Sequence, residues 1–310
     1  MVADRITVGV YALDRVILPT SAVARGWAAR LAETMPVLAE GAAPVGISLT
    51  VGADGLALAA DIRLGAEYRA GTPVAVEPVG GRPGLFLLRV GGKAAALATV
   101  LPWEPGREPA GRSAAPPEAP GAFAHGTLID TPDGPRLVET LAAGDAVTTP
   151  GNGSRPLRWI GRRRVEAVEM LAHPGLRPVV FGPDALGNAR ALSVSPQQRM
   201  LIDDWRAAVY FGEDRVLVAA QALVDDQAAR LVLPPGGVDY VMLLCDRHEV
   251  LLADGVLTES FHPGERGLAA LPPEERARLV EIVPEPELLR RRAAFPIVRN
   301  AEARALRLQP

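Results

Sequence analysis

The sequence predicts a mainly β protein with two domains and a short C-terminal helical tail. Apolar residues alternate with polar ones over several stretches, which is the period of a half-buried β-strand. The 31 Gly and 29 Pro residues favour many turns joined by short strands over long helices. A Pro-, Ala- and Gly-rich segment at residues 103–121 divides the strand-rich sequence in two.

The length and composition of the chain limit the size of these domains and the kinds of molecule that they are expected to bind. A chain of 310 residues has room for two modest domains, and 48% hydrophobic residues are enough for packed cores. Aromatic residues are only 5% of the chain, so Leu, Val, Ile and Ala must fill those cores. The net charge of −3 gives no indication of a nucleic-acid partner.

The sequence also bears on location, metals and cofactors. Residues 1–5 do not begin a signal peptide, and no uncharged run is long enough to span a membrane. We therefore expect a cytoplasmic protein without a membrane partner, and unconventional export stays an open alternative. The single cysteine, Cys245, excludes an internal disulfide and a cysteine-rich zinc site. No metal or cofactor is expected, because none of the histidines has metal-ligand spacing: His125, His173, His248 and His262.

Residues 1–102 are predicted to form a small β-rich domain. Apolar residues alternate or cluster between turns at residues 6–10, 47–51, 56–58, 62–64 and 85–90. One helix is expected to begin at Thr20 or Ser21, with Val23, Trp27 and Leu31 on one face. The domain contains no catalytic constellation.

Residues 103–121 are predicted to be a linker. Pro, Gly, Ala and charged residues dominate, and Trp103 is the only large apolar group. Such a segment cannot bury enough surface to offset the conformational entropy that ordering would cost.

Residues 122–310 are predicted to form an all-β domain with a helical tail. Apolar runs recur between turns at residues 146–149, 157–160, 178–181, 200–202, 216–218, 231–233, 240–244 and 249–252. A helix is expected to begin at residues 272–275, where carboxylates lie at its positive end, and to stop at Pro284. Leu279 and Ile282 then share one face. The basic run at residues 290–292 is expected to be solvated surface.

Six short motifs follow one another in this second domain. They are Ala122-Phe123-Ala124-His125-Gly126-Thr127; Glu139-Thr140-Leu141 with Gly144-Asp145-Ala146-Val147; Pro156-Leu157-Arg158-Trp159-Ile160-Gly161; Ser195-Pro196-Gln197-Gln198-Arg199; Tyr240-Val241-Met242-Leu243-Leu244 with Asp246-Arg247-His248-Glu249; and Ala253-Asp254-Gly255 with Glu259-Ser260-Phe261. In this order they resemble the Hint domain, the hedgehog/intein autoprocessing fold, in its bacterial form. The resemblance implies that the first strand lies beside the loop that carries Ser195 and Gln198.

The resemblance also implies a chemistry. In Hint autoprocessing the thiol of the first residue attacks the preceding carbonyl and gives a thioester. A histidine polarises the scissile amide and protonates the departing nitrogen, and a Ser or Thr three residues before it orients that amide. In inteins, a terminal Asn then releases the C-terminal flank.

This sequence departs from that pattern at each position that the chemistry requires. Ala122 occupies the position of the nucleophile, and Gln198 occupies that of the histidine. Met242 stands where the family has a second histidine, and Glu259-Ser260 stands where inteins end in His-Asn. A glutamine amide donates hydrogen bonds but does not titrate near neutral pH.

Two other side chains are considered as replacements for the missing nucleophile. Thr127 lies two residues after His125, and a strand would put both on one face, although a backbone-bonded Thr beside an exposed His is the expectation. Cys245 precedes His248 by an odd offset, so we expect a small buried apolar residue. Ser195, Gln198 and His248 are thus the remnant positions of the family's catalytic site.

These observations predict a Hint-type protein that resembles self-cleaving proteins but has lost its processing chemistry. A binding or structural role with a protein partner is the leading interpretation, and an enzyme is not expected. Two alternatives stay open. One is residual autocatalytic cleavage near Gly121-Ala122, using Thr127 or an external thiol. The other is that the domain at residues 1–102 is a binding module and carries the function.

Overall fold

A computed structural model of the chain divides into two units. The described residues are 4–17, 37–39, 42–52, 55–79, 85–99 and 118–306. Unit 1 consists of Met1–Pro116, Glu166–Pro174 and Pro234–Gly237, and unit 2 consists of Pro117–Val165, Gly175–Leu233 and Val238–Pro310. The helix expected from Thr20 or Ser21, and residues 103–117 of the expected linker, lie outside the described residues.

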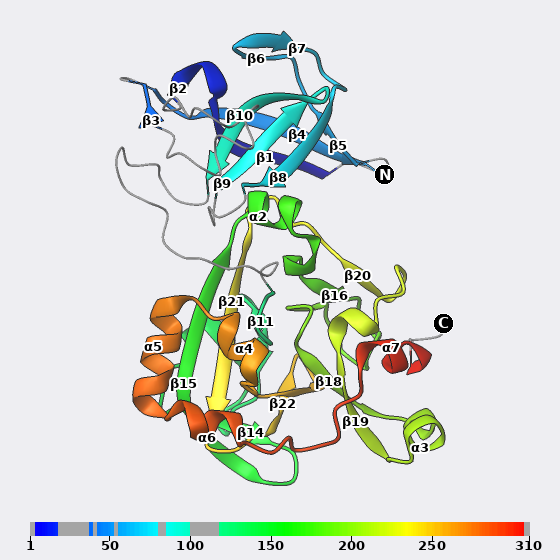
Figure 1. The fold of residues 1–310 in the computed structure, drawn as a ribbon. Helices are drawn as coiled ribbons and strands as arrows, with labels where there is room; N and C mark the ends of the chain where they lie inside the picture. The colour runs from blue at the N-terminus through cyan, green and yellow to red at the C-terminus, as the bar shows by residue number, and fades with distance from the viewer. Residues whose placement is uncertain are drawn as a thin grey trace. The chain divides into compact units, whose positions relative to one another are not determined.

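Unit 1 contains a closed β-barrel, drawn in blue and cyan (Figure 1). Its strand order is β1-β10-β9-β8-β5-β4, and β1 pairs with both β10 and β4. The barrel strands are β1 (Asp4–Ala12), β4 (Val45–Gly52), β5 (Gly55–Leu58), β8 (Pro73–Pro78), β9 (Leu85–Val90) and β10 (Lys93–Thr99). Two short ribbons accompany them, formed by β2 (Val16–Ile17) with β3 (Val37–Leu38) and by β6 (Ile62–Leu64) with β7 (Ala66–Tyr68). The unit also includes helix α2 (Ala167–Ala172).

The period of two along β1 places its apolar side chains inside the barrel. Ile6, Val8 and Val10 are buried, while Thr7 and Gly9 between them are exposed. In register, Ile6 lies opposite Leu49 of β4, whose side chain is also fully buried. The alternation predicted for this strand is therefore confirmed.

Unit 2 is built on two antiparallel sheets. The first has the order β14-β15-β21-β11-β17-β16-β20, and the second has the order β13-β12-β22-β23-β18-β19. Strands of the first are β14 (Ala146–Thr149), β15 (Gly153–Val165), β21 (Val238–Cys245), β11 (Phe123–Ala124), β17 (Leu192–Val194), β16 (Val179–Phe181) and β20 (Ala229–Leu231). Strands of the second are β13 (Arg136–Leu137), β12 (Leu128–Ile129), β22 (Val250–Ala253), β23 (Val256–Glu259), β18 (Arg199–Asp203) and β19 (Arg215–Ala219).

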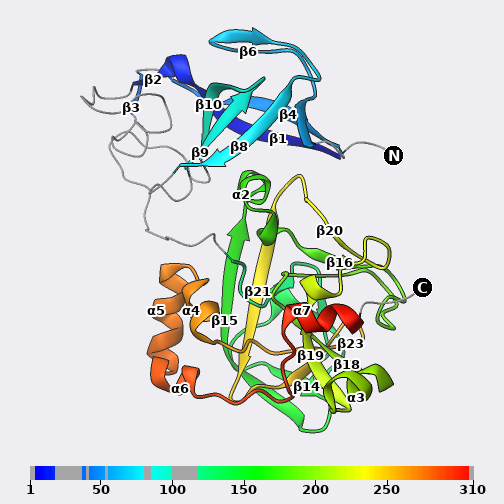
Figure 2. The same ribbon diagram turned by 45° about the vertical axis from the view of Figure 1, so that its right-hand side comes forward.

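Short helices complete unit 2. They are α3 (Trp205–Phe211), α4 (Glu265–Ala269), α5 (Pro273–Ile282), α6 (Glu285–Leu289) and α7 (Asn300–Ala303). Single 3-10 turns lie in unit 2 at Val138–Thr140, Ala220–Ala222 and Arg304–Leu306; the turn at Leu13–Arg15 belongs to unit 1, and the turn at Pro174–Leu176 begins on the last residue of a unit 1 segment. The long strands β15 and β21 run side by side, and α5 lies beside β15 in both views (Figures 1 and 2). Among the described residues, no helix is both long and apolar enough to cross a bilayer.

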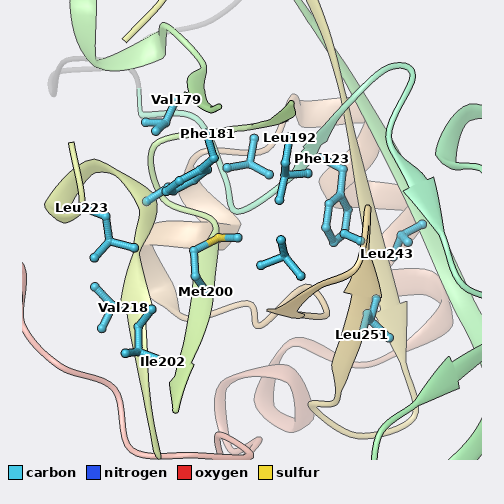
Figure 3. Packing of buried hydrophobic residues seen from close by; sticks show 14 of the residues in the cluster. Phe123, Val179, Phe181, Leu192, Met200, Ile202, Val218, Leu223, Leu243 and Leu251 are labelled. Carbon is cyan, nitrogen blue, oxygen red and sulfur yellow. The ribbon is translucent and has the colours of Figure 1, made fainter. Parts of the chain in front are cut away.

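Aliphatic side chains from both sheets form the core of unit 2. Phe123, Phe181 and Met200 point into the same interior as Leu243 and Leu251 (Figure 3). All five are at most 1% exposed. Few aromatic rings take part, as the composition predicts, so burial of many small apolar groups stabilises this unit.

The mainly β fold with C-terminal helices is confirmed, with local corrections. The expected strand at residues 231–233 is displaced, because β20 ends at Leu231. Helix α5 begins and ends as predicted, but only Leu279 is buried, whereas Ile282 is 44% exposed. Helix α3 was not predicted.

The side chain of Trp159 lies so close to Gly161 that no room is left for a side chain at position 161. Both lie on β15, two residues apart on one face, and the buried Trp159 ring lies directly over the Gly161 backbone. A Cβ atom at Gly161 would overlap the six-membered ring of the indole. Because protein interiors are close-packed, a buried ring has little free space to move into.

We predict that Gly161→Ala lowers the free energy of unfolding by about 1–3 kcal/mol through overpacking. Urea unfolding followed by circular dichroism measures the change. Gly175→Ala is the matched control, because nothing lies within 4 Å of a Cβ atom there. Equal stability of the two variants would contradict the close approach.

Candidate functional site

The site lies where the chain enters the middle of the first sheet of unit 2. Strand β11 is short, but it lies between β17 and β21. Phe123 of β11 pairs with Val194 on one side and Val241 on the other. Strand pairing on both sides fixes the backbone that precedes Phe123, so the position of Ala122 is well defined.

The residues before β11 are also buried. Ala119 and Ala122 are fully buried, Pro120 is buried, and Gly121 is partly exposed. Residues 119–121 form the end of the segment predicted as a linker, so at least this end packs inside unit 2. The Gly121–Ala122 peptide bond therefore lies in a largely water-excluded environment.

Ser195 binds the backbone on both sides of Gly121. Its Oγ accepts a hydrogen bond from the Ala122 N–H at 3.0 Å and donates one to the Pro120 carbonyl at 2.7 Å. The Ser195 N–H donates to the Ala122 carbonyl at 2.9 Å. The prediction that Ala122 lies beside Ser195 is confirmed.

Gln198 lies beside Gly121 and is held by its amide group. Its Nε2 donates to Thr258 Oγ1 at 2.8 Å and to the Glu259 carbonyl at 2.7 Å, which uses both amide hydrogens. Its Oε1 faces Gly121, since a Cβ atom there would lie 3.4 Å from it. The side chain is 1% exposed, so these bonds form without competition from bulk water.

Glu259 supplies a buried carboxylate next to the same glycine. A Cβ atom at Gly121 would lie 3.4 Å from Glu259 Oε1. The Nη1 atom of Arg199 is 3.1 Å and 2.9 Å from the two carboxylate oxygens, and the Arg199 N–H donates to Oε1 at 3.2 Å. These charge-assisted bonds offset the cost of burying the carboxylate.

His248 contacts this carboxylate from the other side. Its Nδ1 accepts a hydrogen bond from the Ala294 N–H at 2.9 Å, so in the neutral ring the proton resides on Nε2. Nε2 lies 3.1 Å from Glu259 Oε2, at ion-pair distance but without the alignment of a hydrogen bond. Glu259 thus separates the imidazole of His248 from Gly121.

A second histidine, which the sequence did not single out, stacks on the first. The rings of His248 and His262 have centroids 4.5 Å apart and an interplanar angle of 27°. Burial, and to a smaller extent the neighbouring His248, lower the pKa of His262 to about 4. Its Nδ1 is buried without a hydrogen-bond partner among the described residues.

The structure does not assemble the alternative nucleophile at Thr127. Its hydroxyl donates to the Ala124 carbonyl at 2.7 Å and is buried, whereas His125 is exposed and lies 3.4 Å from Glu139. The expectation of a backbone-bonded Thr beside an exposed His is confirmed. The idea that both side chains lie on one face of a strand is wrong, because the chain turns at this point, directly after β11.

Met242 and Cys245 belong to the apolar interior of β21. Both are fully buried, and Cys245 packs in the main core cluster as expected. Burial raises the pKa of the Cys245 thiol to about 12, and the nearby carboxylates of Glu249 and Asp246 add to the rise. Extending the β11–β21 register by one residue places Met242 opposite Ala122.

Within the described residues, no group of three or more metal-ligating side chains is close enough to hold a metal ion. Taken together, these contacts define a site in which Ser195, Gln198 and Glu259 surround Gly121–Ala122. Arg199, Thr258 and the two histidines lie behind these three side chains. Sequence reasoning named the first two and His248. It missed the roles of Arg199, Thr258, Glu259 and His262, although all four adjoin or lie within the motifs.

Part of the chain is similar to a known protein family and to a solved structure. The family model of the Hint domain matches residues 121–265. The solution structure of a bacterial intein-like domain from Clostridium thermocellum is 15% identical, covers 44% of this chain and 96% of that domain, and has a TM-score of 0.31. No curated protein matches the chain. The matched segment begins directly before Ala122 and includes Ser195, Gln198 and His248, and we identify residues 121–265 as a Hint domain.

Proposed function

We propose that this Hint domain no longer cleaves or splices the chain and instead has a binding or structural role. The observation that carries the proposal is Ala122. Its N–H, which belongs to the Gly121–Ala122 amide, donates to Ser195 Oγ as an oriented scissile amide would require, yet its side chain is a buried methyl group. A methyl group cannot form the covalent bond on which the acyl shift depends.

The acid–base position supports the same conclusion. Both amide hydrogens of Gln198 are bonded to Thr258 and Glu259, so the group acts as a fixed donor within the domain. An amide does not exchange a proton near neutral pH, so it supplies neither a general acid nor a general base. Gln198 instead satisfies buried polar groups that an apolar residue would leave unpaired.

The two buried histidines do not replace it. The lowered pKa of His262 keeps that ring neutral at pH 7. His248 is engaged at Nδ1 by the Ala294 N–H, and its Nε2 faces Glu259 rather than the Gly121–Ala122 bond. Residual cleavage through Thr127 has no support, because its hydroxyl is committed to the Ala124 carbonyl.

The first prediction concerns processing. Purified wild-type chain incubated with and without dithiothreitol should keep its full mass. Ala122→Cys returns only a thiol, while the triple change Ala122→Cys, Gln198→His, Met242→His also returns the two histidines. We expect the triple variant to release a fragment ending at Gly121 about 100- to 10,000-fold faster than the single variant, since that is the range that acid–base catalysis contributes.

Mass spectrometry over time measures the fragment, and circular dichroism confirms that each variant is folded. The variant Gln198→His, Met242→His with Ala122 retained is the matched control and should stay intact. Cleavage of the wild-type chain at this bond would sink the proposal. Equal rates for the single and triple variants would show that residues 198 and 242 are not the defect.

A second prediction tests the structural role of Ser195. Ser195→Ala removes the partner of the Ala122 N–H and of the Pro120 carbonyl, both in a buried environment. We expect the free energy of unfolding to fall by about 1–3 kcal/mol. The control is Ser193→Ala on β17, the strand that ends directly before Ser195; its hydroxyl has no hydrogen bond within the described part of the chain. A loss no larger than that of the control would argue against this role.

A third prediction concerns pH. The pKa of His262 is about 4 in the folded chain and near 6.5 in the unfolded chain, so unfolded molecules bind more protons between these values. Stability should therefore fall as the pH drops from 6.5 towards 4. His248, Glu259, Arg199 and Arg291 face this ring and stay unchanged in His262→Asn. Urea unfolding across this range should show a shallower pH dependence for that variant, and an equal slope would contradict the buried neutral ring.

A further inference from the structure

Helix α3 presents an apolar face that the domain itself does not cover. Asp204 caps the helix by accepting the Arg206 N–H, and Gly212 ends it in the left-handed conformation. Ala207 is buried and Phe211 packs against the core, so one side of the helix is anchored. The other side carries three large apolar residues that are 71%, 66% and 55% exposed: Trp205, Val209 and Tyr210.

An acidic pocket adjoins this face. Its volume is about 630 Å³, and it lies at the edge strand β19, where Ile297 adds a parallel bridge to Leu217. Two aromatic rings and four carboxylates line it: Trp205, Phe295, Asp203, Asp204, Glu213 and Asp214. Trp205 therefore belongs both to the pocket wall and to the apolar face.

The carboxylates of the pocket are only partly neutralised. Asp203 lies 2.9 Å from Arg215, and Asp204 lies 2.8 Å from Arg206. Glu213 and Asp214 are exposed and form no ion pair with the residues that the structure describes. The pocket thus keeps a negative charge beside an exposed indole. Both the carboxylates and the face of the indole ring attract a cationic side chain.

We propose that the face of α3 and this pocket bind a basic segment of a partner protein. A Lys or Arg side chain enters the pocket, where the carboxylates of Glu213 and Asp214 pair with it and Trp205 offers the face of its ring. Apolar side chains next to that cation cover Val209 and Tyr210. These two residues do not line the pocket, so a small cation alone would leave them exposed.

This inference rests on the proposed binding role and names its partner chemistry. The full-length chain is titrated into a fluorescein-labelled decapeptide of alternating Arg and Leu, and fluorescence anisotropy is measured. We expect saturable binding with a Kd below about 1 mM, weakened at high salt because exposed charges are screened. Glu in place of Arg should abolish binding, and Ser in place of Leu should weaken it.

Two variants locate the binding site. Trp205→Ala, and separately Glu213→Gln with Asp214→Asn, should each raise the Kd at least about threefold. The charge-matched control is Glu274→Gln with Glu281→Gln on α5, whose side chains are exposed and outside the pocket. Its Kd should equal that of the wild type. Thermal unfolding checks that all variants remain folded.

Several outcomes would overturn the inference. They are no saturable binding up to about 1 mM peptide, an unchanged Kd in both pocket variants, or equal affinity for the Ser-containing peptide, which would indicate a small-cation site. Self-association of the chain that Trp205→Ala abolishes would make this face an interface between copies. Mass spectrometry of the same samples tests processing separately, since a fragment ending at Gly121 would sink the proposed inactivity and leave the peptide result standing.

Discussion

The hydroxyl of Ser195 is the interaction on which the rest of the site depends. The backbone from Ala119 to Ala122 enters the interior of the domain, and buried backbone groups require hydrogen-bond partners. One hydroxyl serves two of them, by accepting from Ala122 and donating to Pro120. Strand β11 has only two residues, so its backbone pairing does not extend to the residues before it. The side chain of Ser195, directly after β17, supplies the missing hydrogen bonds.

The polar groups behind Ser195 form a connected and mostly satisfied set. Gln198 bonds to Thr258 and to the Glu259 backbone, Glu259 pairs with Arg199, and His248 closes the set. Such a network is stable only when nearly every member has a partner, because an unpaired buried polar group is costly. This explains how the hydrogen-bonded arrangement around Gly121–Ala122 is stable although residue 122 carries only a methyl group. The hydrogen bonds stabilise the fold whether or not a reaction takes place.

The sequence predicted those features that depend on local pattern. Alternation identified β1 and β4, because one face of each is buried. Strand β10 gave no alternation signal of its own, because its core is the Ala-rich run at residues 94–98, which has weak β propensity. Helix α3 was not predicted because it has only seven residues and its apolar side chains lie on the exposed side as well as on the buried side, so no helical period stands out.

The site was predicted in the same partial way. The motif order placed Ala122 beside Ser195 and Gln198, and the structure agrees. The pairing of Arg199 with Glu259 depends on the register that sets Met200 opposite Thr258, across almost sixty residues of chain. The stacking of His248 on His262 depends likewise on the path of the chain after β23. Neither contact leaves a local signal, since each joins residues from separate motifs.

The burial of Cys245 has a practical consequence for studying this protein in solution. It is the only thiol in the chain, it lies in the core, and its pKa is raised to about 12. Maleimides and other thiol reagents react with an accessible thiolate, which this residue does not offer near neutral pH. A cysteine introduced on the surface would therefore be the single reactive position. With one such cysteine on each unit, spin labels or donor–acceptor dyes can be attached without first removing the native residue, so the distance between the two units is open to direct measurement.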